Sequence, residues 1–161
     1  MSVLIVSSVL LVGLALVACI AAFPEQVGRP IPRWRLAVPP LLVGATTLGL
    51  LYLPPSHLGE TQIWMMSLVA AVLGLARGAL IGLRVDQRQR RLLLRRAPEG
   101  FWIAAVAALL IVADVTAKPL GHVGSAYVQS VELALAVLSG FLIGRNLALA
   151  VRSRDTPHRD L

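Results

Sequence analysis

Five long apolar stretches constrain this 161-residue chain more than any other feature of its sequence. They lie at about 3–23, 36–53, 62–83, 101–117 and 127–151. At about 1.5 Å per helical residue, each can cross most or all of a roughly 30 Å hydrocarbon core. Hydrophobic residues make up 57% of the chain, above the roughly 45–50% typical of soluble domains. The sequence therefore predicts an all-α integral membrane protein: one five-helix transmembrane bundle over residues 1–151, with a polar tail at 152–161.

The basic residues predict an orientation for this bundle. Along the four successive loops, Lys and Arg number three, zero, six and one, and the tail adds three. Basic residues that flank membrane helices stay on the cytoplasmic side. The alternation predicts an outside N-terminus and an inside C-terminus, in a bacterial cytoplasmic (inner) membrane. Because the net charge of +7 is concentrated at the ends of apolar stretches, anionic lipid headgroups are favoured over nucleic acid as its partner.

Cys19 is the single cysteine, which excludes an intrachain disulfide and a paired-thiol redox motif. It ends the sequence Leu16-Val17-Ala18-Cys19, which matches a lipoprotein cleavage box. Cleavage and lipidation there would place the basic first and third loops outside, against the charge rule. A first transmembrane helix containing a buried cysteine is therefore favoured over a lipoprotein.

Two glycine series predict close helix packing. Gly74, Gly78 and Gly82 recur every four residues in the third stretch, and Gly140 and Gly144 do so in the fifth. Residues four apart share a helix face. Small residues let helix backbones approach in lipid, where packing drives association. We expect the third and fifth helices to pack through these stripes within one chain; the alternative is that one stripe forms a homo-oligomer.

An internal repeat accompanies the glycines. Gly78-Ala79-Leu80-Ile81-Gly82 resembles Gly140-Phe141-Leu142-Ile143-Gly144, and an arginine follows each. The likeness predicts two parallel helical hairpins, 34–84 and 102–145, after one extra helix. Such repeats are frequent in transporters. The alternative is chance similarity between apolar segments.

Four ionisable residues fall within the apolar stretches: Arg77, Asp114, Glu132 and Arg145. A charge at the bilayer centre costs at least about 2.5–3.5 kcal/mol, so such residues are candidates for function. We expect both arginines, near the inner helix ends, to extend to the interface. We expect both carboxylates, near the outer ends, to be exposed at the interface or paired with Lys118; burial would make them proton-binding candidates. Because the two charge types lie in opposite halves, pairing between them is not expected.

The third loop is a basic segment. Its arginines are Arg84, Arg88, Arg90, Arg91, Arg95 and Arg96, and we expect them to contact lipid headgroups. Residues 85–94 suit either a small hairpin or a short interfacial helix, on which Arg84, Arg88, Arg91 and Arg95 would share one face. The pattern does not decide between them.

His57 and His122 in the two outer loops, together with Glu60, are the grouping that could suggest a metal or haem site. Their spacing follows no ligand pattern, and solvated loop histidines are favoured. No clustered nucleophile, base and metal set is visible either. The sequence therefore predicts no catalytic residue, no metal site and no cofactor.

A family resemblance rests on several segments: Gly82-Leu83-Arg84-Val85-Asp86, Arg91-Leu92-Leu93-Leu94, Pro98-Glu99-Gly100 and the later Gly140–Arg145 run. Together they resemble small bacterial inner-membrane proteins of unknown function, including the CcdC-like group. The group's name implies a link to cytochrome c biogenesis, although paired cysteines and a haem-attachment motif are missing here. The resemblance carries no catalytic residues.

The function expected from the sequence is that of a non-enzymatic accessory or assembly subunit. It would act through glycine-mediated helix packing and its basic loop, with anionic lipids and either a second copy or an unidentified membrane protein as partners. The alternative is a small proton-linked transporter or channel-like protein that uses Asp114 and Glu132.

The orientation is open to a direct test. A reporter fused after Val151 should lie in the cytoplasm, so a GFP fusion should fluoresce and an alkaline phosphatase fusion should be inactive. The same reporters in the second loop, 54–61, should behave in the opposite way. Phosphatase activity after Val151 would contradict the predicted orientation.

Overall fold

The computed structural model describes residues 2–52, 60–86, 91–95, 98–117 and 125–155. Its elements, in chain order, are α1 (Ser2–Val27), β1 (Ile31–Pro32), the 3-10 helix η1 (Arg33–Leu36), α2 (Val38–Tyr52), α3 (Glu60–Leu80), β2 (Gly82–Asp86), β3 (Arg91–Arg95), α4 (Glu99–Ala117) and α5 (Ser125–Asp155). Five helical spans are long and apolar enough to cross a membrane. The predicted five-helix architecture is therefore confirmed in its helices, and a small sheet is added to it.

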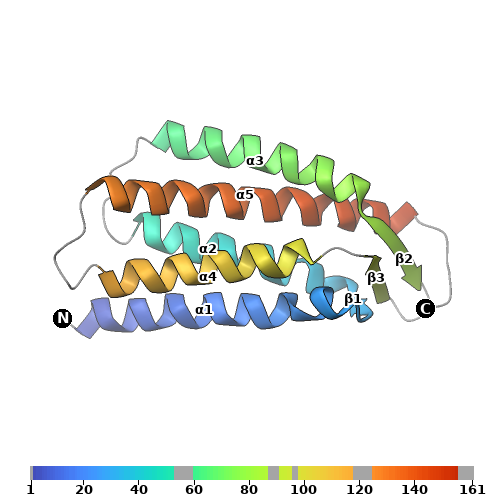
Figure 1. Ribbon diagram of the computed structural model, residues 1–161, viewed down its shortest axis with the longest axis horizontal. Helices are drawn as coiled ribbons and strands as arrows, with labels where there is room; N and C mark the ends of the chain where they lie inside the picture. Colours follow the sequence, from blue (N-terminus) through green and yellow to red (C-terminus); the bar gives the residue numbers. More distant parts are fainter. Residues whose placement is uncertain (1, 53–59, 87–90, 96–97, 118–124, 156–161) are drawn as a thin grey trace.

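The helices form one elongated bundle (Figure 1). Helices α1, α3 and α5 run in one direction, and α2 and α4 run in the other. The three strands and the end of α5 lie at one end of the bundle, opposite the start of α1. The arginine-rich segment and the last helix end therefore share one end of the molecule, which we call the basic end. The side of the membrane that it faces stays a prediction.

Small side chains fill much of the main core. Its buried members are Leu11, Ala15, Ala18 and Ala22 of α1, Val43 and Leu50 of α2, Ala104, Ala107, Ala108 and Ile111 of α4, and Val131, Leu135 and Leu142 of α5. The alanines of α1 and α4 face this common core, and α1 packs closely along α4. Close packing of small residues is the usual source of helix association in lipid.

Helix α3 lies at the edge of the bundle and packs almost entirely against α5 (Figure 1). Gly74 and Gly78 of α3 meet the α5 backbone near Arg145, and the glycines of α5 meet the α3 backbone in return. A β-carbon added at Gly144 would lie 2.7 Å from the carbonyl carbon of Ala71 and nearer still to its oxygen. One at Gly140 would lie 2.8 Å from the Ser67 Oγ. The two stripes thus face each other within one chain.

Gly82 is not part of the stripe, and its assignment to the third helix is wrong. Helix α3 ends at Leu80, and Gly82 begins β2. Arg152 of α5 stops the helix there, because its Nη1 donates to the carbonyls of Gly78 and Ile81, at 2.9 Å and 2.8 Å. A cationic side chain often satisfies the last carbonyls of a helix in this way.

The basic segment folds as a hairpin, so the interfacial-helix alternative for residues 85–94 is wrong. Strand β3 lies between β2 and the short β1, antiparallel to both, with Leu92 opposite both Val85 and Ile31. These three side chains are buried with Leu36 of η1 and Leu149 of α5 in a second core cluster. The sheet therefore docks on the helix ends through one apolar face.

Two helices extend further than the sequence predicted. Helix α1 continues past Pro24 to Val27 and ends in a Schellman motif, in which Arg29 N–H donates to the Pro24 carbonyl and Gly28 adopts φ +67°. Helix α5 continues to Asp155, so Arg152 and Arg154 belong to a helix and not to the tail. Both extensions bring charged residues into the basic end.

The glycine contact predicts a clear difference between two identical substitutions. Gly144→Ala should lower the free energy of unfolding by roughly 1–3 kcal/mol, because the new methyl group overlaps the α3 backbone. Gly13→Ala is the matched control, since a β-carbon at Gly13 of α1 would meet nothing within 4 Å. Unfolding in detergent by SDS titration measures both. Equal stability of the two variants would contradict the packing described here.

Candidate functional site

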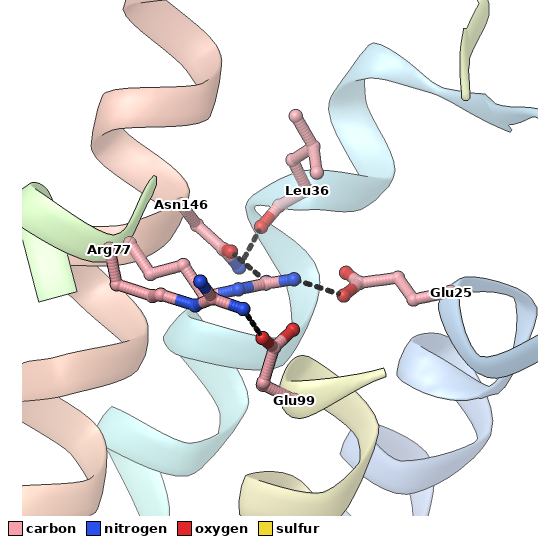
Figure 2. A network of polar contacts seen from close by, with 6 residues as sticks. Glu25, Leu36, Arg77, Glu99 and Asn146 are labelled. Atoms are coloured by element: carbon pink, nitrogen blue, oxygen red, sulfur yellow. Dashed lines mark hydrogen bonds and ion pairs between the residues drawn. The ribbon is translucent and has the colours of Figure 1, made fainter. Parts of the chain in front are cut away.

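The functional site is built around Arg145 of α5, whose side chain is completely buried at the basic end of the bundle. Its Nη2 donates to Glu25 Oε2 of α1 at 2.8 Å, and the Glu25 side chain is only 3% exposed. Figure 2 shows the Glu25 carboxylate pointing toward the centre of this network. The expectation that Arg145 extends to the interface is therefore wrong. Its charge is neutralised inside the protein by a residue 120 positions away.

Local backbone features make room for this ion pair. Helix α1 continues past Pro24 before its Schellman motif, and this extra turn carries Glu25 to the level of Arg145. Gly100, in the first turn of α4, leaves the space that the pair occupies. A β-carbon there would lie 2.8 Å from Arg145 Nη1 and would also collide with Glu25 Oε2. A larger residue at this position would therefore displace the ends of the two paired side chains.

Asn146 connects the pair to the start of α2. Arg145 Nη1 donates to Asn146 Oδ1 at 2.8 Å, and Asn146 Nδ2 donates to the Leu36 carbonyl at 2.8 Å. The Leu36 carbonyl lies at the end of η1, just before α2 (Figure 2). A buried polar group without a hydrogen bond would cost a few kcal/mol. Asn146 removes that cost for an arginine nitrogen and a backbone oxygen together.

A second ion pair lies beside the first. Arg77 of α3 donates through Nη2 to Glu99 Oε1 at the start of α4 (Figure 2). The Arg77 side chain is 44% exposed, so this contact is much more accessible than the buried one. It links the edge helix α3 to a helix with which it otherwise has little contact. Arg77 is thus partly exposed and paired with a carboxylate; its expected position at the membrane interface stays a prediction.

The two pairs together form a neutral group of two arginines and two glutamates. With Asn146 added, we call this group the ion-pair cluster: Glu25, Arg77, Glu99, Arg145 and Asn146. It joins α1, α3, α4 and α5, and through Leu36 it reaches η1. A buried ion pair adds little net stability compared with apolar packing, but loss of one partner is costly. The cluster therefore fixes how the helix ends fit together more than how stable they are.

The two carboxylates at the other end of the bundle are also buried. Asp114 of α4 is 3% exposed and Glu132 of α5 is 5% exposed. Each interacts with other parts of the protein. The expectation of interfacial exposure is therefore wrong for both, and the expected partner Lys118 lies outside the described residues. Both side chains are therefore enclosed within the bundle, as that of Glu25 is at the other end.

The basic segment presents arginine on the open face of its sheet. Arg84 and Arg91 are exposed, and the strand register places them on the same face. The single helical face expected for Arg84, Arg88, Arg91 and Arg95 is wrong, because the segment is not helical. Arg88, Arg90 and Arg96 lie outside the described residues.

The possible metal site of the sequence consists of His57, His122 and Glu60. His57 and His122 lie outside the described residues, and Glu60 begins α3. Within the part of the chain that the structure describes, no group of three His, Cys, Asp or Glu residues could hold a metal ion.

Sequence reasoning missed both glutamates of the ion-pair cluster, together with Asn146 and Gly100. Glu25 follows the first predicted apolar stretch and Glu99 precedes the fourth, so neither counts among the ionisable residues within the apolar stretches. The available signal is that each is an acid near several arginines, at the predicted helix ends that Arg77 and Arg145 also approach.

The chain matches none of the protein-family models, curated proteins or solved structures with which it was compared. The resemblance to the CcdC-like group therefore stays an expectation, and function has to be argued from the geometry alone.

The two arginines of the cluster should differ sharply in their effect on stability. Arg145→Met leaves the Glu25 carboxylate buried without its partner and should cost roughly 3–5 kcal/mol. Arg77→Met is the matched control and should cost about 1 kcal/mol or less, because solvent screens that pair. SDS titration of the purified variants measures both. Similar losses of unfolding free energy for the two variants would contradict the difference in burial between the two ion pairs.

Proposed function

We propose that this protein is a non-enzymatic, multi-pass protein of the bacterial cytoplasmic membrane that serves as an accessory or assembly subunit. It would act through its packed helices and its basic cytoplasmic face, in contact with anionic lipids and a membrane protein partner. Nucleic acid is not among its proposed partners.

The observation that carries the proposal is the docked sheet. An arginine-rich loop needs no tertiary structure simply to stay on the cytoplasmic side of a membrane. Here the segment is folded, and Val85, Leu92 and Leu94 anchor it in an apolar cluster with Leu149 of α5. Exposed arginines on an ordered surface can recognise a partner with less loss of conformational entropy than arginines on a flexible loop.

The ion-pair cluster supports the same role. Its charges neutralise one another and engage four helices, so the basic end of the bundle is held in one arrangement. The glycine contact between α3 and α5 places the end of α3, and with it the start of the sheet, against α5. Both features keep the arginine-bearing face in a fixed position relative to the membrane helices.

A second candidate function is proton-linked transport. The specific observation in its favour is the burial of Asp114 and Glu132, one on each of two successive helices. Intramembrane carboxylates commonly belong to proton or ion pathways. The tight alanine-rich core of α1 and α4 favours the accessory role over this one.

A site-specific crosslinker separates the two candidates. Replacing Arg84 with a photoreactive amino acid in native membranes should yield one defined protein adduct, because Arg84 is exposed on the sheet. The pair of charge reversals Arg84→Glu and Arg91→Glu should reduce co-purification of that partner at least several-fold. Arg29→Glu is the control, since Arg29 is an exposed arginine at the same end but outside the sheet.

Equal loss with Arg29→Glu, or the lack of any defined adduct at Arg84, would contradict the accessory role. Proton-coupled flux in liposomes that disappears with Asp114→Asn would instead favour the transporter.

A further inference from the structure

One stripe of the central helix α5 is uncovered at the basic end. Ile143, Leu147 and Val151 are each about half exposed, at 47%, 53% and 52%, although the rest of this helix is largely enclosed. Their spacing of four residues places them on one face. The same face ends in the exposed side chain of Arg154. The apolar stripe of α5 therefore ends at a positively charged side chain.

The length of this stripe matches one leaflet of a bilayer. From Ile143 to Arg154 an α-helix rises about 16 Å. Half of the hydrocarbon core is roughly 15 Å thick. An acyl chain that lies along the stripe would therefore place its glycerol phosphate at the level of Arg154.

Helix α2 lies beside the stripe. Ile143 is the nearest neighbour of Gly44, since its Cδ1 would lie 3.9 Å from a β-carbon added there. Leu41 and Leu48, one turn on either side of Gly44, are both exposed. Because Gly44 has no side chain, the surface between the exposed leucines of α2 and the stripe of α5 carries no side-chain atoms at this residue.

A second guanidinium group lies close to Arg154. Arg33 of η1 donates from Nη2 to the carbonyl of Ser153, the preceding residue, at 3.0 Å. Its Nε is buried and has no hydrogen-bond partner among the described residues, so Arg33 keeps donor capacity. The neighbouring Trp34 is 69% exposed, and exposed tryptophans of membrane proteins lie at headgroup depth. Arg33 is thus held against the α5 backbone next to Arg154, so two arginines from different elements border the end of the stripe.

We propose that the α5 stripe and these two arginines bind one anionic phospholipid. Its acyl chain packs on Ile143, Leu147 and Val151 beside α2, and its phosphate lies between Arg33 and Arg154. A zwitterionic lipid offers the chain without net negative charge, and inorganic phosphate offers the charge without the chain. The site uses no residue of the sheet or of the ion-pair cluster, so it does not depend on the accessory role.

Native mass spectrometry of the full chain in detergent tests this site. Phosphatidylglycerol should bind as a single tight adduct, well ahead of phosphatidylcholine. Arg154→Gln should weaken that adduct roughly fivefold, the effect expected for one basic residue at an anionic surface. Arg29→Gln is the matched control: it removes an exposed arginine at the same end of the bundle, outside the proposed site, and should change the affinity by less than about twofold. Leu147→Gln should also weaken the adduct, because it removes one apolar side chain of the α5 stripe.

Three results would overturn the proposal. One is equal binding of phosphatidylcholine and phosphatidylglycerol. Another is an equal effect of Arg154→Gln and Arg29→Gln. The third is displacement of the adduct by millimolar inorganic phosphate, which would indicate an anion site that does not recognise lipid.

Discussion

The ion pair between Glu25 and Arg145 joins the first membrane helix to the last and fixes the basic end of the bundle. A charge in this environment has to be neutralised within the protein, because no water is available to solvate it. Arg145 can stay buried only if α1 reaches far enough and if α4 leaves room for the contact. The continuation of α1 past Pro24 to Val27 and the lack of a side chain at Gly100 meet these two conditions. Helix length and a single glycine are thus consequences of one electrostatic requirement.

Helix α3 is attached by a different physical mechanism. It lies at the edge, its outer face is exposed and apolar, and it holds to α5 through backbone contact at glycines on both helices. Within a membrane, apolar surface alone gives no preference for another helix over lipid. Close approach of two backbones supplies that preference through dispersion and weak Cα–H···O contacts. Arg152 and the Arg77–Glu99 pair then determine where α3 ends and how its end connects to the sheet.

The five spans could be predicted because length and hydropathy report directly on crossing a bilayer. The ion-pair cluster could not. Arg77 and Arg145 look equivalent in the sequence, each next to a stripe glycine, yet one is half exposed and the other fully buried. The difference follows from the position of α3 at the edge and α5 at the centre, which local pattern does not contain. The hairpin was undecided for the same reason: the Leu92-Leu93-Leu94 run does not alternate, and besides pairing with β2 the strand packs on Ile31 and Leu149, both distant in sequence.

An ordered basic face on a bundle held by internal charge pairs is the basis of the accessory role proposed here. The coupling free energy between Glu25 and Arg145 tests that account most directly. It is obtained from a double-mutant cycle with Glu25→Gln, Arg145→Gln and the double variant, each unfolded in detergent. The account predicts a coupling of about 2 kcal/mol or more, since the two charged groups are in direct hydrogen-bonded contact and are both buried. Additive effects within about 0.5 kcal/mol would contradict it.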